Sequence, residues 1–218
     1  IKECDWSSDV CSSDLRYVTL PPVYAITLES TPQRTQRLKK HLEAQNIQWT
    51  PWEGFDAAQW GLATLHPYML CTPERIVEQK HVGLHLSHWS LWQHLSKIEG
   101  EAFTVLEDDA QFSEGWQAQV EQAIQSLPAC WEMLLIGSGN TFDKPKMQWR
   151  NNVWDVRYPQ CTHAYIVRKQ ALDKLLKTAR KAWAPIDIAL AIASYPVMNV
   201  FTVLPRIVTQ HGQEYIAE

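Results

Sequence analysis

The stretch TVLEDDAQF, residues 104–112, places three consecutive acids directly behind a β-branched apolar run. The apolar residues continue back to Ala102 without alternation, as in a strand that is covered on both faces. In open α/β sheets ligands bind beyond the carboxyl ends of the strands. Glu107, Asp108 and Asp109 therefore stand where a binding site is expected.

A cation is the simplest explanation for three neighbouring carboxylates, because they repel one another when semi-buried. Mg²⁺ and Mn²⁺ take hard oxygen ligands, typically one or two protein carboxylates together with water and phosphate oxygens. The triplet thus indicates a divalent metal and a phosphorylated ligand. Three acids alone leave an alternative open, which is a solvated acidic loop or a cap for a following helix.

Strands and helices alternate along the chain on both sides of the triplet. VYAITL (23–28) is typical of a buried strand, and Pro32 opens a helix over 30–47. Helical spacing over 74–99 ends at Gly100, with Gly83 as a break or a close-packing point. The pattern predicts an α/β fold, a single domain with a mixed, mainly parallel sheet flanked by helices. Further strands are expected at 48–55, 131–137, 199–205 and near 152–156 and 162–167, and further helices at 114–126, 169–182 and 185–193.

Composition excludes several classes of protein. A net charge of −4 over 218 residues lacks the basic field that nucleic-acid binding requires, so no nucleic-acid partner is expected. The longest apolar-leaning stretch, 184–201, contains an acid and two prolines and is too short to cross a bilayer. Five scattered cysteines without a C-x-x-C pair indicate neither a zinc site nor a disulfide framework, and they favour a reducing cytoplasm.

Residues 1–15, IKECDWSSDVCSSDL, have no helical or strand periodicity. They resemble translated sequencing-adapter read-through, and we interpret them as a non-native tail. A disordered native tail is the alternative. The domain itself is expected over 16–218.

Five segments resemble, in order, glycosyltransferase family 25, which includes lipopolysaccharide, lipooligosaccharide and collagen galactosyltransferases. The resemblance runs from about Val23 to Gln210, with Thr27 and Glu29 standing where the family often has Asn and Asp. The segments are VYAITLESTPQRTQRLKKHL, the Gly-x-x-x-Ser-His helix GLHLSHWSLWQHL (83–95), VLEDDAQF, THAYIVRKQALDKLL and APIDIAL.

The resemblance implies a GT-A-like, nucleotide-sugar-binding fold and a metal-dependent inverting transfer with Mn²⁺ or Mg²⁺. The donor would be a UDP-hexose, UDP-galactose first, and the acceptor a saccharide or lipid-linked oligosaccharide in lipopolysaccharide or lipooligosaccharide synthesis. On this mapping Asp109 is the first metal ligand, Glu107 holds the ribose or a metal-bound water, and Asp108 is a ligand or a helix cap. Strand alternation predicts that Glu107 and Asp109 share a cleft while Asp108 points away.

The donor-binding candidates lie on the first strand and helix. Arg34 and Arg37 are one turn apart and could meet a diphosphate or uracil, with a plain solvated face as the alternative. The main chain of Ile26 and Thr27, at the end of the first strand, could bind the base.

Histidines recur on the helix that contains Ser87. His81, His85 and His88 have the spacing of a zinc-binding face, but no H-E-x-x-H pattern accompanies them. Ser87 and His88 instead match the family's Ser-His pair, so they are expected to line the donor pocket or to brace the acid strand.

An inverting transfer needs a base, and Asp187 is the candidate because a charge in so apolar a segment is unusual. A helix cap is its alternative role. Tyr165 and Trp183 are candidates for contact with the acceptor or sugar, against an ordinary place in the core. His211 could complete the metal shell or lie on the surface.

Two other functions compete with an enzyme. A non-catalytic carbohydrate- or nucleotide-binding module would keep the fold and lose turnover. A receiver-type switch also uses acids and Mg²⁺, but VYAITL ends without the acidic pair that it needs. Beyond a cytoplasmic location, peripheral contact with an anionic membrane competes with ordinary solvation for the basic residues Arg168, Lys169, Lys174, Lys177, Arg180 and Lys181.

Overall fold

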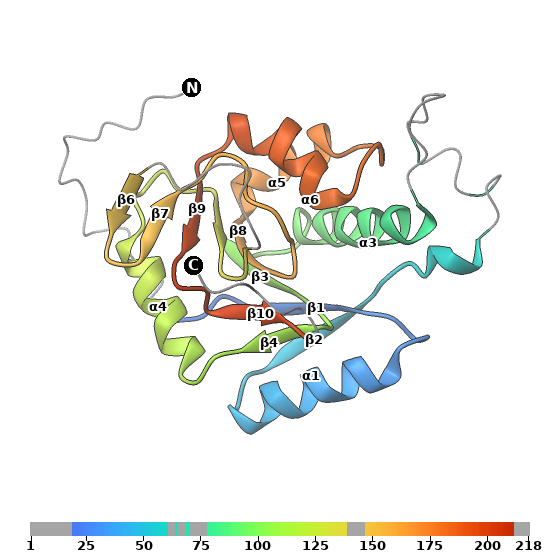
Figure 1. Ribbon diagram of the computed structural model, residues 1–218, viewed down its shortest axis with the longest axis horizontal. Coiled ribbons are helices and arrows are strands. Elements are labelled where there is room, and N and C mark those ends of the chain that lie inside the picture. The colour runs from blue at the N-terminus through green and yellow to red at the C-terminus, as the bar shows by residue number, and fades with distance from the viewer. Residues whose placement is uncertain (1–18, 61–63, 65–68, 70–77, 139–146, 212–218) are drawn as a thin grey trace.

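An eight-stranded sheet forms the centre of a computed structural model that describes residues 19–60, 64, 69, 78–138 and 147–211 (Figure 1). Within these residues, β8 and β7 run opposite to the other six strands, which confirms a mixed sheet with one dominant direction. In spatial order the strands are β2 (Trp49–Glu53), β1 (Val23–Thr27), β3 (Ala102–Glu107), β8 (Ala164–Arg168), β5 (Met133–Leu135), β9 (Val200–Val203), β7 (Val153–Asp155) and β6 (Met147–Arg150).

Helices cover both faces of the sheet, so the fold has three layers (Figure 1). On one face α1 (Pro32–Ala44) and α4 (Trp116–Ser126) pack into one apolar core. On the other face α3 (Gln79–Leu95), α5 (Lys169–Thr178) and α6 (Ile186–Ala189) pack into a second core. This arrangement confirms the predicted α/β class.

The strand β3 is buried along its whole length because both cores use it. Ala102 and Leu106 belong to the core under α1 and α4, whereas Phe103 and Val105 belong to the core under α3 and α5. Successive side chains of a strand point to opposite faces. The side chain of Glu107 therefore falls on the α3 side.

The helices follow their sequence signals. Pro32 begins α1, as predicted, and Leu38 and Leu42 are its buried residues. Gly83 is the predicted close-packing point of α3, because a Cβ there would collide with the carbonyl oxygen of Phe55 and approach Ala57 to 3.0 Å.

Several boundaries differ from the predictions. β3 ends at Glu107 rather than continuing through the acids, because the chain turns at the next two residues into β4 (Ala110–Phe112). A two-stranded sheet of β4 and β10 (Val208–Gln210) was not predicted, since strands of three residues give little periodicity. The late helical segment is α6 followed by η3 (Leu190–Ser194) and η4 (Tyr195–Val197), and η1 (Ala57–Gln59) was also missed.

Three other expectations concern the ends, the cysteines and the membrane. The interpreted tail 1–15 and the start of the predicted helix over 74–99 lie outside the described residues. Cys130 is disulfide-bonded, although the cysteine spacing did not indicate a disulfide framework, because spatial proximity rather than sequence spacing decides pairing. Cys161 is a free thiol. Among the described helices none combines the length and apolar character that a bilayer span needs.

Candidate active site

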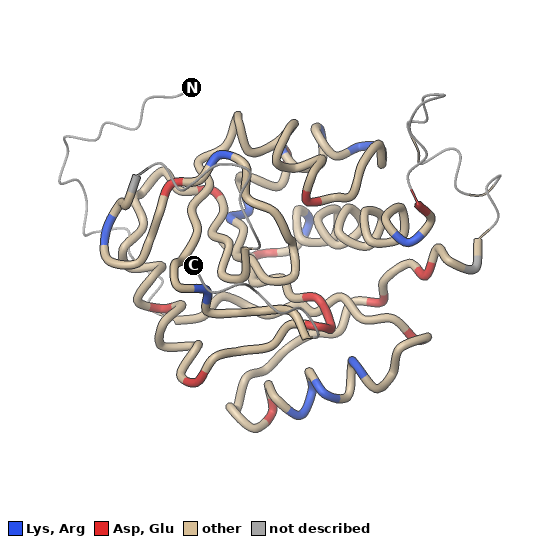
Figure 2. Tube along the Cα trace, viewed as in Figure 1, with Lys and Arg blue, Asp and Glu red and all other residues tan. Residues whose placement is uncertain are grey.

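Arg34 on α1 holds the second and third acids of the triplet. Its Nη2 lies 2.7 Å from Asp108 Oδ1 and 2.9 Å from Asp109 Oδ2. Thr31, just before α1, donates its hydroxyl to the other oxygen of Asp108 at 3.1 Å. Figure 2 shows this acidic turn close to the basic residues of α1. The guanidinium thus supplies positive charge to both aspartates, at a place where a divalent metal ion was expected from the sequence.

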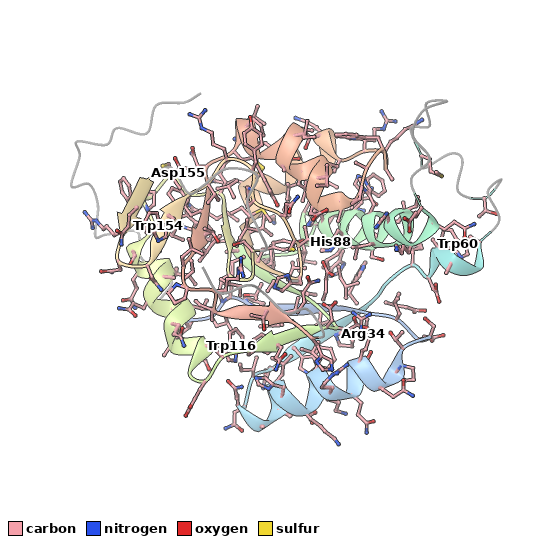
Figure 3. All side chains as sticks on the ribbon, viewed as in Figure 1. Arg34, Trp60, His88, Trp116, Trp154 and Asp155 are labelled. Carbon is pink, nitrogen blue, oxygen red and sulfur yellow. The ribbon has the colours of Figure 1, made fainter. Side chains whose placement is uncertain are left out.

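The first acid belongs to a different environment. Glu107 Oε1 accepts a hydrogen bond from the Thr162 hydroxyl at 2.7 Å and lies 3.2 Å from His88 Nε2. Figure 3 shows His88 on the α3 side and Arg34 on the α1 side of the sheet. This division differs from the expected pairing of Glu107 with Asp109, because the strand ends at Glu107 and the two aspartates sit in the turn.

The carboxyl pKa values follow this division. Burial raises the pKa of Asp108, and Arg34 opposes that shift. Burial, with added repulsion from Glu107, raises the pKa of Asp109 to about 6 despite Arg34. Burial also acts against ionisation of Glu107, but the hydrogen bonds from His88 and Thr162 outweigh it and hold its pKa below the usual range. The three acids therefore ionise in two different settings.

A divalent cation fits the aspartates in one respect. Asp109 Oδ1 is buried and has no hydrogen-bond partner, and Arg34 contacts only the other oxygen of this carboxylate, so Oδ1 is open to a further ligand. Within the described residues no group of three or more His, Cys, Asp or Glu side chains is arranged to hold a metal. The residues thus suit a cation bound by one or two carboxylates, Asp109 with Asp108, and completed by ligand and water oxygens.

The donor-binding candidates on β1 and α1 differ in how accessible they are to a ligand. Ile26 lies inside the sheet, between Trp52 and Glu107 in the strand register, and the Thr27 carbonyl accepts the Gly54 N–H at 2.8 Å. Sheet pairing therefore occupies much of the main chain that was expected to bind a base. Arg37, one turn beyond Arg34, is exposed.

Ser87 braces a loop. Its hydroxyl donates to the Gly83 carbonyl at 2.7 Å and accepts the Phe55 N–H at 2.8 Å. The neighbouring His85 contacts the Ala179 carbonyl through Nε2, away from His88. The histidines of α3 thus have separate partners, and of the Ser-His pair His88 is the one that reaches the acids.

Asp187 is linked to Glu107, at the end of β3, by the loop that contains Cys161 and Thr162. Its Oδ2 accepts the Cys161 N–H at 3.1 Å, and its Oδ1 accepts the N–H of Ile188 at 2.8 Å. The next loop residue is Thr162, which contacts Glu107. Asp187 is half-buried and sits in the first turn of α6, so the structure gives it the contacts expected of a helix cap as well as a place near the site.

The two aromatic candidates differ in exposure. Tyr165 is completely buried, and its hydroxyl lies 2.8 Å from Trp92 Nε1 and 3.0 Å from His88 Nδ1. This leaves Tyr165 no surface for a sugar, because the strand β8 lies in the middle of the sheet. Trp183 is half-buried.

The end of the described chain returns to the acids through β10. His211 donates its main-chain N–H to the Asp109 carbonyl at 2.8 Å, and the Gln210 side chain lies 3.5 Å from Asp109 Oδ2. Sequence reasoning named His211 but missed the contacts that Gln210, Thr31 and Thr162 make with the acids, since these contacts join segments that are far apart in the chain.

Much of the basic patch is engaged within the protein. Arg168 donates to the Ala129 carbonyl, Lys169 to the Ile98 carbonyl, and Lys174 lies 2.6 Å from Glu132. The exposed members are Lys177, Arg180 and Lys181.

An acid-tipped strand in a mixed sheet between helical layers fits the fold that the sequence resemblance implies. The family described as glycosyltransferase family 25 (LPS biosynthesis protein) matches residues 20–190. The chain belongs to glycosyltransferase family 25.

The curated relatives are distant and longer than this chain. A glycosyltransferase 25 family member of Drosophila pseudoobscura pseudoobscura is 22% identical over 198 residues, covering 83% of this chain and 30% of its own length. Procollagen galactosyltransferase 2 of Mus musculus is 23% identical over 168 residues, covering 71% and 27%. A protein of Bos taurus named probable inactive glycosyltransferase 25 family member 3 is 23% identical over 184 residues, covering 78% and 31%. The chain spans under a third of the length of each.

Solved structures share the fold at low identity. A glycosyltransferase involved in the glycosylation of the major capsid of PBCV-1 has a TM-score of 0.50 at 12% identity, with 89% of this chain and 95% of that chain covered. A197 from STIV also has a TM-score of 0.50, at 9% identity, with 91% and 98% covered. These likenesses show the fold alone.

Proposed function

We propose that the chain is a metal-dependent inverting glycosyltransferase that moves a hexose from a nucleotide diphosphate to a saccharide. The proposed donor is UDP-galactose, and the proposed acceptor is a saccharide or lipid-linked oligosaccharide of lipopolysaccharide or lipooligosaccharide. The observation that carries the proposal is the pair Asp108 and Asp109 at the end of β3, in which two acids share one guanidinium and Asp109 Oδ1 is buried without a hydrogen-bond partner.

The aspartates would hold Mn²⁺ or Mg²⁺, Asp109 first. The bound ion would neutralise the charge that develops on the departing diphosphate. Arg34, which lies against both aspartates, is suited to bind a diphosphate oxygen, because a guanidinium pairs well with phosphate. Glu107, held separately by His88 and Thr162, would accept hydrogen bonds from the ribose or a bound water.

Asp187 is the proposed base for the acceptor hydroxyl. Each of its oxygens accepts one main-chain hydrogen bond, so each keeps a lone pair for a further contact. Two neighbouring loop residues connect it with Glu107. Trp183, half-buried near the start of α6, remains the candidate for stacking on the sugar.

A donor panel tests the proposal. UDP-galactose and other nucleotide sugars are incubated with saccharides, with Mn²⁺ or with a chelator, and both hydrolysis and transfer are measured. We expect transfer only with metal, and we expect Asp109→Ala to reduce it about 10²- to 10³-fold, the usual range for loss of one preorganised charge-stabilising group. Donor binding that is unchanged by the chelator would contradict the metal site.

A binding module is the second candidate, and the relative named as probable inactive favours testing it. In that case the wild-type protein would bind sugar without turnover. Asp109→Ala would then retain sugar affinity, whereas an enzyme would lose both transfer and metal-dependent donor binding.

A further inference from the structure

A chain of buried hydrogen bonds leads from the core of the protein to Glu107. Trp92 Nε1 donates to the Tyr165 hydroxyl at 2.8 Å, that hydroxyl lies 3.0 Å from His88 Nδ1, and His88 Nε2 lies 3.2 Å from Glu107 Oε1. Trp92, Tyr165 and His88 are completely buried, and the histidine ring packs against both aromatic rings. The residues come from α3, β8 and β3, so tertiary packing assembles the chain.

The direction of each hydrogen bond in this series follows from the groups at its two ends, the Trp92 indole N–H and the Glu107 carboxylate. An indole N–H can only donate, so the Tyr165 oxygen accepts from Trp92. The Tyr165 hydrogen must then have an acceptor, because an unmade buried hydrogen bond is costly, and His88 Nδ1 is within reach. With Nδ1 accepting, the ring hydrogen of His88 sits on Nε2 and points at the Glu107 carboxylate.

The same geometry orients the carboxylate. His88 and Thr162 both bind Oε1 of Glu107, and among the described residues no side chain donates to Oε2. We propose that Trp92, Tyr165 and His88 are positioning residues that fix Oε1 of Glu107 and thereby present Oε2 to the donor. That Oε2 faces a sugar donor rests on the proposed function. The series of hydrogen bonds from Trp92 to Glu107 does not depend on it.

Tyr165→Phe tests the role, because it removes one hydroxyl and keeps the buried ring. We expect the affinity for UDP-galactose with Mn²⁺, measured by calorimetry, and kcat/KM for transfer to fall about 10- to 100-fold, the usual cost of losing a group that orients a site residue.

Thr104→Val is the matched control. Thr104 lies on the same strand as Glu107, is fully buried, and donates its hydroxyl to the Pro21 carbonyl at 3.0 Å, away from the acids. The control loses one buried hydroxyl of the same strand with comparable cost in stability, and we expect its donor affinity and transfer to stay within about threefold of wild type, as for a change remote from the site.

The ¹⁵N shifts of His88, assigned by their loss in His88→Gln, provide a readout that needs no activity. We expect the hydrogen on Nε2 and an acceptor Nδ1 in the wild type, and a mixture of tautomers in Tyr165→Phe. A hydrogen on Nδ1 in the wild type would overturn the inference, and so would equal effects of Tyr165→Phe and Thr104→Val on donor affinity. If the wild type binds and transfers no sugar, the proposed function fails, and the tautomers alone then decide the hydrogen-bond chain.

Discussion

The two sides of the β3 carboxyl end treat chemically similar acids in opposite ways. On the α1 side, Asp108 and Asp109 face one guanidinium, and burial raises the pKa of both. On the α3 side, Glu107 faces two hydrogen-bond donors that hold its pKa below the usual range. One triplet therefore contains an acid whose pKa is lowered by His88 and Thr162 and two acids whose pKa values stay raised although they share Arg34.

The difference shows that hydrogen bonds to a carboxylate and a nearby cation are not equivalent. Donors that point at Glu107 stabilise its charge in place, whereas Arg34 is a cation with 37% of its side chain exposed. On the α3 side the contacts therefore fix the orientation of the Glu107 carboxylate. On the α1 side we expect a bound metal ion to replace the charge that Arg34 supplies to Asp108 and Asp109.

The largest expected effect is a pH dependence of the free energy of unfolding that comes from Asp109 on the α1 side. In the folded protein the pKa of Asp109 is raised to about 6, so the folded state holds a proton that the unfolded chain has released above about pH 4. The free energy of unfolding should therefore fall as pH rises from about 4 through 6, by up to about 3 kcal/mol for this group. Asp109→Asn lacks this titration and should become more stable than wild type by that amount near neutral pH without metal.

Urea unfolding of both proteins between pH 4 and 7, with a chelator present, measures the difference. The other groups of the chain are shared and largely cancel in the subtraction. A stability difference that does not change with pH would show that Asp109 is already ionised at low pH, and the contrast between the two sides would disappear.

A middle-sized effect is expected at Arg34. Arg34→Gln leaves both aspartates without their cation and should lower the free energy of unfolding at neutral pH by about 1–3 kcal/mol. Added Mn²⁺ should raise the Tm of this variant more than that of wild type, because the metal then replaces the missing charge. Arg37→Gln is the control, since Arg37 is exposed one turn away. Equal Tm values for the two variants, with and without metal, would contradict the expectation that the metal replaces the charge of Arg34.

The smallest effect is expected at Ser87 on the α3 side. Ser87→Ala leaves the Phe55 N–H without its acceptor and should cost about 1 kcal/mol of stability. Donor affinity should change less than threefold, because the hydroxyl is fully used within the protein. Thermal unfolding and calorimetry measure the two quantities. A large loss of donor affinity at unchanged Tm would instead make Ser87 a direct donor contact.

Local sequence signals predicted most of the fold. The uninterrupted apolar run before Glu107 marked β3, and Pro32 marked the start of α1. Such signals work because burial on two faces and fixed proline geometry act within a few residues. The short pair β4 and β10 escaped prediction, because it depends on two segments that are far apart in the chain.

The sequence predicted where in the chain the candidate site residues lie, but not which of them contact one another. The triplet, Arg34 and His88 were all named from the sequence, whereas the link from Tyr165 to His88 was not. For Tyr165 the sequence left contact with the sugar and a place in the core both open, because an aromatic residue on a strand gives no sign of whether its hydroxyl meets solvent or a buried ring. The contacts of Thr162 and Gln210 with the acids were also missed, because they join segments that are far apart in the chain.

The sequence by itself determined that three carboxylates end a buried strand, because adjacency and apolar flanks are properties of the chain. Only the tertiary structure decided which acid receives which partner. That choice depends on where β3 ends and on which helix covers each face: alternation sends Glu107 to α3, and the turn after it delivers both aspartates to Arg34.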